Sequence, residues 1–384
     1  MRILQLGKFF PLKGGVEKVM YALAKELSER GIDCDAMFAS KDGHTKDIQL
    51  NEHCHIYICR TYMEAKATMI APTMISMLKL VCHRYDIIHV HHPDPMAALA
   101  LRMSGFKGRV VLHWHCDIVR QNKLLKLYRP LQSWLIRKAD VIVGTTPVYL
   151  EQSDALSQVQ HKCRCIPIGV YEPQADAALT ERLRRQYAGR KVIFSLGRLV
   201  LYKGYDVLIQ AASLLPDDYI VLIGGSGHQH NHLEQLIAAQ GLEHKVKLLG
   251  FIPDSQLGSY FEACDVFCLP SIDKREAFAI VQVKAMVHSR PIVSTDIPGS
   301  GVPWVNKHGV SGLTVAPRDR QALAVALQEV CNDATRYQHY AMQARLRYEQ
   351  LFRMDTMISA CHALYQQLLS EPDSAPLLST FPTA

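Results

Sequence analysis

Residues Asp265 to Lys284 read DVFCLPSIDKREAFAIVQVK and carry the clearest evidence for the fold of this chain. The apolar run up to Leu269 predicts a short buried strand, and the residues from Glu276 onward predict the opening of a helix. A carboxylate at such a junction lies beside backbone N–H groups, where open parallel sheets bind their ligands. We therefore expect a ligand site around Glu276, with a simple helix-capping carboxylate as the alternative.

Composition limits the possible classes of protein. The chain has 384 residues, 48% of them hydrophobic and 21% charged, which is enough for two globular domains and argues against disorder. The net charge of +7 suits a polyanionic small ligand or an anionic membrane surface, and no dense Lys/Arg tract points to nucleic acid. Eleven cysteines without a CxxC pair indicate reduced thiols, and Met1–Leu6 predicts a strand instead of a signal peptide. We expect a cytoplasmic protein.

Short apolar runs alternate with helical patterns, which predicts an α/β protein with parallel sheets covered on both faces. The predicted strands of the first half are 3–6, 36–38, 56–59, 87–90, 110–112, 141–143 and 164–166, with a helix over 16–30. The pattern restarts with strands at 192–196, 219–223, 246–249, 266–269 and 291–293, and ends with helices at 321–330, 334–351 and 354–369. We predict two doubly wound Rossmann-like domains facing across a cleft, 1–170 and 171–353, and a flexible tail at 372–384.

A second predicted ligand loop reads GRLVLYKG from Gly197 to Gly204. Arg198 and Lys203 stand five residues apart at a strand-to-helix turn, so both cations can converge on one anionic group. Two fixed cations stabilise a departing phosphate more than they stabilise the ground state. A solvated basic turn is the alternative interpretation.

These motifs resemble those of retaining glycosyltransferases of family 4. The segment from Glu276 to Lys284 is similar to the family signature E-x-F-G-x-x-x-x-E, with Ala279 in place of the Gly and Lys284 in place of the second Glu. The loop from Gly197 to Gly204 is similar to the family motif G-R-x-x-x-x-K-G. The resemblance implies the GT-B fold, in which the last helix, about 354–371, crosses back onto the first domain.

The resemblance also implies an activity. Enzymes of this family move a sugar from a nucleotide-sugar with retention at the anomeric carbon, and the leaving phosphate takes the acceptor proton. The loops look most like enzymes of bacterial surface-polysaccharide assembly, such as O-antigen or capsule synthesis. This implies a hexosyltransferase that uses GDP-mannose or a UDP-hexose and a glycan or lipid-linked acceptor.

Site residues are carried over by position. The predicted catalytic residues are Arg198, Lys203, Glu276, which orients the sugar, and His115, which lies on the acceptor side with Asp117. The predicted donor-binding residues are Gly14, Gly15, Gly225, Phe251, Ala277, Phe278, Ala279, Ile280 and Lys284. Gly14 and Gly15 precede a predicted helix, whose N-terminal N–H groups favour phosphate, although a plain tight turn is the alternative.

Lys284 leaves three alternatives open. The family uses a Glu there to accept both ribose hydroxyls, whereas lysine has three donors and no acceptor. The chain is then an active enzyme with an altered ribose contact, an enzyme with weaker donor binding, or a sugar-nucleotide-binding pseudoenzyme. We favour the first two, because Arg198, Lys203 and Glu276 are present. A nicotinamide-dependent oxidoreductase is disfavoured, since the first strand-to-helix turn lacks G-x-G-x-x-G.

Histidines crowd the ends of two predicted strands, at His89, His91, His92, His113 and His115. No Cys/His spacing supports a metal site, so we predict polar packing and no metal cofactor. Asp33-Cys34-Asp35 matches the D-x-D motif of another glycosyltransferase fold, but it lies at a strand entry and predicts a structural role.

Two segments combine apolar and basic residues. The first contains Met63, Met69, Met74 and Met77, and the second extends over 120–138. Such segments are either core helices or faces that rest on anionic lipid. They leave open a peripheral contact with the inner face of the membrane.

Overall fold

The computed structural model describes residues 1–12, 14–40, 44–65, 68–118 and 122–370. The chain divides into two compact units: unit 1 is Met1–Gly169 together with the segment that begins at Asp355, and unit 2 is Val170–Met354. The predicted flexible tail, 372–384, lies outside the described residues.

Unit 1 is built on an eight-stranded sheet in the order β10-β9-β8-β7-β1-β2-β4-β3. Every neighbouring pair is parallel except β3 and β4. Two further strands, β5 (Met63–Ala65) and β6 (Thr68–Ile70), form a separate antiparallel pair. The strands of the main sheet are β1 (Arg2–Phe10), β2 (Asp33–Ser40), β3 (Lys46–Asn51), β4 (Cys54–Arg60), β7 (Ile87–His92), β8 (Arg109–Trp114), β9 (Val141–Gly144) and β10 (Cys163–Cys165).

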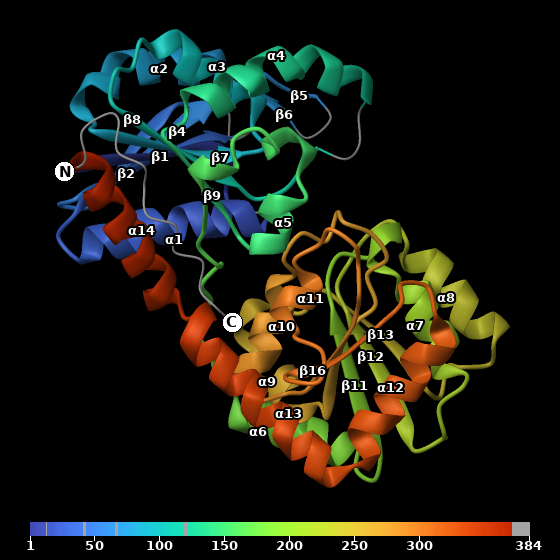
Figure 1. Cartoon of the computed structure of the whole chain (residues 1–384). Helices are drawn as coiled ribbons and strands as arrows, with labels where there is room; N and C mark the ends of the chain where they lie inside the picture. The colour runs from blue at the N-terminus through green and yellow to red at the C-terminus, as the bar shows by residue number, and fades with distance from the viewer. Residues whose placement is uncertain (13, 41–43, 66–67, 119–121, 371–384) are drawn as a thin grey trace. The chain divides into compact units, whose positions relative to one another are not determined.

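The helices of unit 1 include one from the far end of the sequence. In order they are α1 (Gly15–Glu29), α2 (Pro72–Val81), η1 (Cys82–Arg84), α3 (Pro95–Ser104), α4 (Asn122–Lys138), α5 (Pro147–Glu151), η2 (Asp154–Leu156), η3 (Gln160–Lys162) and α14 (Met354–Ser370). Figure 1 shows the red α14 beside the blue α1, and Arg30 joins Asp355 by an ion pair of 2.7 Å. The last helix therefore completes the first unit.

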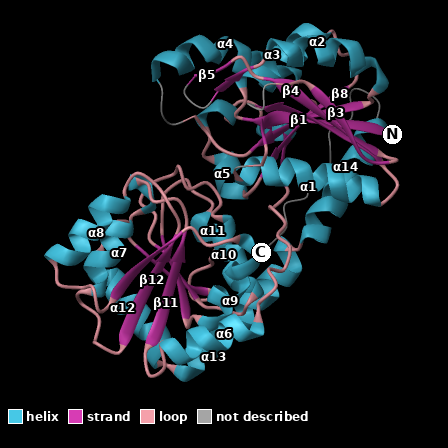
Figure 2. Cartoon of the chain, turned by 180° about the vertical axis from the view of Figure 1, so that it is seen from behind, coloured by secondary structure: helices cyan, strands magenta, loops and turns pink. Residues whose placement is uncertain are grey.

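Unit 2 is a six-stranded parallel sheet in the order β13-β12-β11-β14-β15-β16, with helices on both faces (Figure 2). Its strands are β11 (Lys191–Leu196), β12 (Tyr219–Gly224), β13 (Val246–Gly250), β14 (Val266–Leu269), β15 (Ile292–Thr295) and β16 (Gly312–Val315). The strand order reverses between β11 and β14, and such a switch point is where doubly wound sheets bind ligands.

The helices of unit 2 are mostly those that separate consecutive strands. They are α6 (Ala177–Gln186), η4 (Leu201–Lys203), α7 (Tyr205–Ala212), α8 (His230–Ala239), α9 (Asp254–Ala263), α10 (Ile280–Val287), α11 (Val302–Val305), α12 (Arg320–Asn332), α13 (Ala334–Arg347) and the π-helical η5 (Tyr348–Phe352). Leu208, Ile223 and Val293 are fully buried in the core that α7 and α12 share with the sheet. The two doubly wound units confirm the predicted fold class.

Two chemical features of the whole chain bear on function. All eleven cysteines are free thiols, and most are buried. Within the described ranges, no helix has both the length and the apolarity needed to cross a bilayer.

Candidate functional site

The loops after β11 and β14 meet at the switch point of unit 2. Lys203 ends the short helix η4 after β11, and Glu276 lies in the loop between β14 and α10. The Lys203 amine is 2.6 Å from Oε2 of Glu276, and the two side chains are only 10% and 9% exposed. The hydroxyl of Ser271, just after β14, donates to the same oxygen at 2.8 Å. The structure thus joins two of the predicted catalytic residues in one buried ion pair.

Glu276 does not cap the following helix. Helix α10 begins at Ile280, and its first turn has no capping hydrogen bond from a side chain. Ala279, which precedes it, adopts a left-handed conformation with φ of 62°. Glycine adopts this conformation at lower cost, which explains why the related signature has Gly at this position. The helix-capping alternative for Glu276 was therefore wrong.

The backbone before α10 presents unused donors. Among the described residues, the N–H groups of Ala277, Phe278, Ala279 and Ile280 have no hydrogen-bond acceptor. Successive free N–H groups at the start of a helix favour an anion or a hydroxyl oxygen. The Phe278 ring is buried against Phe352, 5.9 Å between ring centres, so only its backbone can serve a ligand.

Arg198 is not a member of the ion pair. It follows β11 with an exposed side chain, although the next residue, Leu199, is fully buried, and its guanidinium has no ion-pair partner in the part of the chain that the structure describes. An exposed guanidinium is available to a phosphate group of a ligand. The predicted convergence of Arg198 with Lys203 on one anion stays a prediction.

Glycines allow these loops to approach one another closely. Gly225, after β12, has φ of 130°, and a Cβ there would lie 1.9 Å from the carbonyl oxygen of Gly197. Gly204 has φ of 67°, and its Cβ would lie 2.1 Å from the carbonyl oxygen of Pro270. Backbone contact replaces side-chain packing at both positions. Phe251, after β13, is 76% exposed.

Sequence reasoning missed three residues around the ion pair. Tyr205 is buried, and its hydroxyl has no hydrogen-bond partner among the residues that the structure describes. Arg275 is held by both carboxylate oxygens of Asp273 and lies over the ring of Tyr202, 4.8 Å from its centre. No pattern in the sequence distinguishes these residues from ordinary loop and helix positions.

Lys284 is half-buried on α10, four residues after Ile280 and so on the same helical face.

In unit 1 the predicted site residues follow the carboxyl ends of β1 and β8. Gly14 caps the N-terminus of α1, and a Cβ there would lie 2.6 Å from Oε2 of Glu17. Burial raises the pKa of Glu17, while hydrogen bonds from the N–H groups of Glu17 and Gly14 oppose that rise. The Glu17 carboxylate therefore accepts a hydrogen bond from the N–H of Gly14, which the sequence analysis expected to bind phosphate. Gly15 is the first residue of α1.

Asp117 stabilises the loop after β8 by hydrogen bonds. Its Oδ1 accepts hydrogen bonds from the Trp114 indole at 3.0 Å and the Ser153 hydroxyl at 2.7 Å, and its N–H donates to the Tyr149 hydroxyl at 2.8 Å. These contacts give Asp117 a structural role, and its predicted acceptor contact stays a prediction. His115, two residues earlier, is 5% exposed.

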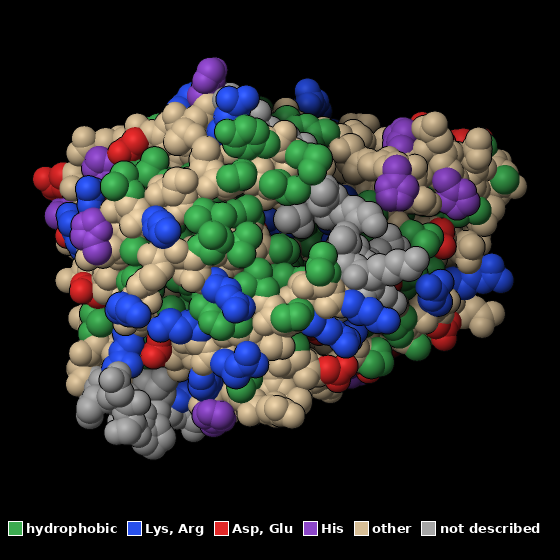
Figure 3. All heavy atoms as spheres, turned by 90° about the horizontal axis from the view of Figure 1, so that it is seen from above, with side chains coloured by type: hydrophobic (Ala, Val, Ile, Leu, Met, Phe, Trp, Pro, Cys, Tyr) green, Lys and Arg blue, Asp and Glu red, His purple; other side chains and the backbone are tan. Residues whose placement is uncertain are grey.

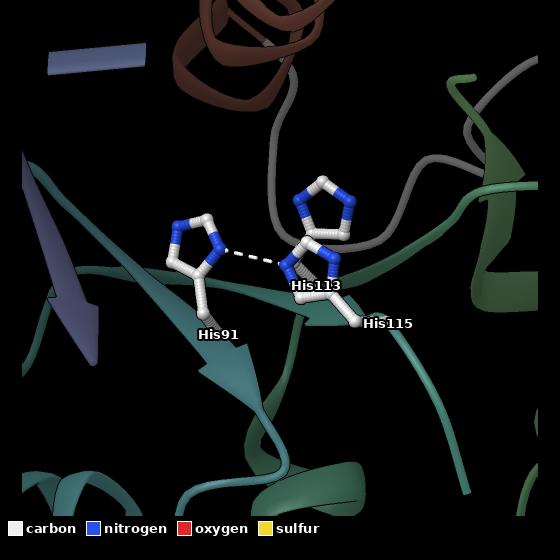
Figure 4. A group of neighbouring side chains, drawn as sticks. All are labelled: His91, His113 and His115. Atoms are coloured by element: carbon white, nitrogen blue, oxygen red, sulfur yellow. Dashed lines mark hydrogen bonds between the residues drawn. The ribbon is translucent and has the colours of Figure 1, made fainter. Parts of the chain in front are cut away.

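His115 belongs to a stack of buried histidines with His91 and His113 (Figure 4). Their candidate ligand atoms lie within 4.8 Å of one another. The rings are nearly parallel, however, with angles of 8° to 24° between their planes. Stacked rings direct their lone pairs side by side, whereas a tetrahedral metal needs them to converge. The geometry thus favours polar packing, and the absence of a metal cofactor stays a prediction.

The D-x-D motif has structural partners. Asp33 lies 2.9 Å from Nδ1 of His53, while Asp35 accepts from the N–H of His55 at 2.6 Å and the hydroxyl of Tyr85 at 2.5 Å. These bonds fasten the entry of β2 to its neighbours, in agreement with the predicted structural role.

Comparisons with known proteins agree with this geometry. A family model described as "Glycosyltransferase Family 4" matches residues 13–172, and one described as "Glycosyl transferases group 1" matches residues 181–347. The chain is 32% identical over 375 residues to O-antigen chain mannosyltransferase C of Escherichia coli, with 96% of this chain and 99% of that protein covered. It is 30% identical over 356 residues to D-rhamnosyltransferase WbpZ of Pseudomonas aeruginosa, with 92% of each covered.

A solved structure supports the fold. Anabaena Alr3699/HepE in complex with UDP matches with a TM-score of 0.77 at 22% identity, over 96% of this chain and all of that one. The two Rossmann-like units and this match show the GT-B fold. Together with the sequence relatives, the matches show that the chain belongs to glycosyltransferase family 4.

Proposed function

We propose that this glycosyltransferase moves a hexose, with mannose as the first candidate, from a nucleotide-sugar to a glycan or lipid-linked acceptor in surface-polysaccharide synthesis. The name of the Escherichia coli relative supports mannose and an O-antigen product. GDP-mannose is accordingly the first donor to test, and UDP-hexoses are the next. The observation that carries the proposal is the buried pair of Lys203 and Glu276 at the switch point of unit 2.

In this proposal unit 2 holds the donor. The free N–H groups before α10 and the amine of Lys203 bind the pyrophosphate, and Arg198 adds a second cation. Glu276 accepts hydrogen bonds from sugar hydroxyls and keeps the ring in position. Its second partner, the Ser271 hydroxyl, fixes the carboxylate when Lys203 turns toward phosphate. No metal is required, because the protein supplies the cations.

The proposed transfer retains the anomeric configuration. The bond between the anomeric carbon and the phosphate oxygen breaks, and a bond from the same face to the acceptor oxygen forms. The acceptor proton passes to the leaving phosphate, so no carboxylate forms a bond to the sugar. His115, at the end of β8, orients the acceptor or a sugar hydroxyl.

The test is transfer by the purified full chain. GDP-mannose and UDP-hexoses are offered with a lipid-linked glycan acceptor, nucleotide release is measured, and the linkage of the product is determined by NMR. We expect an α-linked product from an α-linked donor. A β-linked product refutes retention, and transfer with none of these donors refutes the donor class.

The pseudoenzyme alternative rests on Lys284, which stands where the family has a glutamate. Lys284→Glu restores the family residue, and Lys274→Glu is a matched charge reversal outside the motif. If the unaltered chain binds donor without releasing nucleotide and only Lys284→Glu releases it, the chain is a pseudoenzyme. Turnover by the unaltered chain excludes that alternative.

We also propose that unit 1 rests on the cytoplasmic face of an anionic membrane. Leu80 on α2, Met103 on α3 and Leu127 on α4 are 64%, 48% and 80% exposed, and Lys79 and Arg102 lie next to two of them in the sequence. Figure 3 shows hydrophobic side chains mixed with Lys and Arg on the face formed by these helices. Apolar groups with basic neighbours bind anionic lipid by insertion and charge attraction.

Vesicle sedimentation tests this contact. We expect the chain to bind vesicles that contain phosphatidylglycerol more strongly than vesicles of phosphatidylcholine, and Leu80→Ser/Leu127→Ser to weaken that binding. Leu214→Ser changes a 45% exposed leucine of unit 2 and is the control. Equal binding by both variants contradicts the proposed surface.

A further inference from the structure

A continuous set of hydrogen bonds crosses the buried face of the unit 1 sheet, from α14 to His115. The Tyr365 hydroxyl lies 2.6 Å from Nδ1 of His89, and the side-chain amide nitrogen of Gln5 donates to that hydroxyl at 3.2 Å. Nε2 of His91 lies 2.9 Å from Oε1 of Gln5, and Nδ1 of His91 lies 2.9 Å from Nε2 of His115. Tyr365, Gln5 and His89 are completely inaccessible to solvent.

The chemistry of these groups fixes where the protons lie. The amide oxygen of Gln5 can only accept, so Nε2 of His91 carries the proton. Burial lowers the pKa of His91 and His115 well below the usual value, so both rings are neutral near pH 7. Nδ1 of His91 is then an acceptor, and Nε2–H of His115 is its donor (Figure 4). Nδ1 of His115 is left as an acceptor.

The orientation of the Gln5 amide depends on α14. Its nitrogen needs acceptors, and Tyr365 supplies the oxygen, with the Cys34 sulfur as a weaker partner at 3.6 Å. The Tyr365 hydroxyl can accept from Gln5 because its own proton goes to Nδ1 of His89. Without that hydroxyl, the amide nitrogen loses its oxygen acceptor. Rotation of the amide, which points this nitrogen at Nε2 of His91, then becomes favourable. The ring protons of His91 and His115 would then each move to the other ring nitrogen, which puts the proton of His115 on Nδ1.

We propose that Tyr365 and Gln5 are positioning residues that fix His115 in the Nε2–H tautomer and so make its Nδ1 a hydrogen-bond acceptor for a substrate hydroxyl. Across the described residues, the side-chain hydrogen bond of His115 to His91 uses Nε2, and its Nδ1 takes no part in that bond. The substrate contact rests on the function proposed above for His115. The tautomer depends only on the hydrogen bonds of unit 1.

Histidine NMR on the full chain measures the tautomer directly. With ¹⁵N-labelled histidine, two-bond ¹H–¹⁵N spectra distinguish protonated from unprotonated ring nitrogens, and His115→Gln assigns the signals of His115. We expect Nε2–H at His115 in the unaltered chain. We expect Tyr365→Phe and Gln5→Met each to populate the Nδ1–H form. Cys361→Ala, which removes a fully buried side chain one turn earlier on α14, is the control and keeps Nε2–H.

The outcomes separate the parts of the proposal. Nδ1–H at His115 in the unaltered chain, or no change in either variant, overturns it. A change in Gln5→Met alone removes Tyr365 from the network. Transfer assays follow: we expect Tyr365→Phe to lower kcat/KM by roughly tenfold, the effect of one lost hydrogen bond, and Cys361→Ala to lower it less. A tautomer shift without loss of activity leaves the network standing and refutes the substrate contact of His115.

Discussion

The ion pair between Lys203 and Glu276 leads to a quantitative prediction for the stability of unit 2. Lys203→Met and Glu276→Gln each remove one charge with little change of volume, and the double variant removes both. At 2.6 Å the gross attraction is about 6 kcal/mol with an effective dielectric constant of about 20. Desolvation of two side chains that are only 10% and 9% exposed offsets much of that attraction.

The cost of breaking the pair is larger than its net value. We expect Lys203→Met to lower the free energy of unfolding by about 3 kcal/mol, because it leaves a buried carboxylate with only the Ser271 hydroxyl. Glu276→Gln keeps an oxygen near Ser271 and should cost about 2 kcal/mol. The double variant leaves no buried charge and should also cost about 2 kcal/mol, which gives a coupling energy of about 3 kcal/mol.

Hydrogen exchange followed by mass spectrometry measures these values in unit 2 itself. Peptides that cover the buried strands β11 and β14 report the opening free energy of the core beside the pair. Opening free energies of both single variants within about 0.5 kcal/mol of that of the unaltered chain contradict this prediction, and so do losses that simply add in the double variant.

Three further predictions concern the loops and the histidines. Arg198→Ala should lower turnover in transfer assays about 100-fold, while the free energy of unfolding changes by less than about 0.5 kcal/mol because the side chain is exposed. A loss of unfolding free energy as large as the loss of transition-state stabilisation contradicts its role at the leaving group. Gly225→Ala should destabilise unit 2 by about 3 kcal/mol and weaken donor binding in calorimetry, since its Cβ would lie 1.9 Å from the Gly197 oxygen; a stable variant with unchanged affinity counts against that close contact. Burial lowers the pKa of His92 and His113 to about 3, below the unfolded value, so the unfolded chain binds more protons in acid. Unit 1 should therefore keep this stability above about pH 6.5 and lose up to about 1.4 kcal/mol per pH unit for each histidine below it. An opening free energy of unit 1, corrected for the pH dependence of intrinsic amide exchange, that stays constant between about pH 7 and pH 5 contradicts this.

Elements with a clear apolar pattern were predicted well. The strand β14 was predicted at its observed limits, and β11 and β12 within one residue, because buried parallel strands are short apolar runs. Strand β3 was missed, since Lys46–Asn51 is a mostly polar edge strand that lies almost entirely exposed. Strand β16, Gly312–Val315, was also not predicted.

Two residues that were predicted as catalytic, Lys203 and Glu276, lie together in the structure, and their catalytic role stays a prediction. Their contact follows from the strand order, because both loops leave the carboxyl edge of the sheet at the switch point. Individual side-chain contacts between distant segments have no local pattern, and several were not predicted. The stacking of Arg275 on Tyr202 is one example, and the hydrogen bond between Gln5 and Tyr365 is another.

The bond between Gln5 and Tyr365 joins residues 360 positions apart, and this separation has a consequence for biosynthesis. Translation proceeds at roughly 5 to 20 residues per second, so α14, which packs on β1, is synthesised roughly 20 to 70 seconds after that strand. All of unit 2 has been translated by then. The second unit can therefore fold before the first is complete, which reverses the usual order for a chain made from its N-terminus.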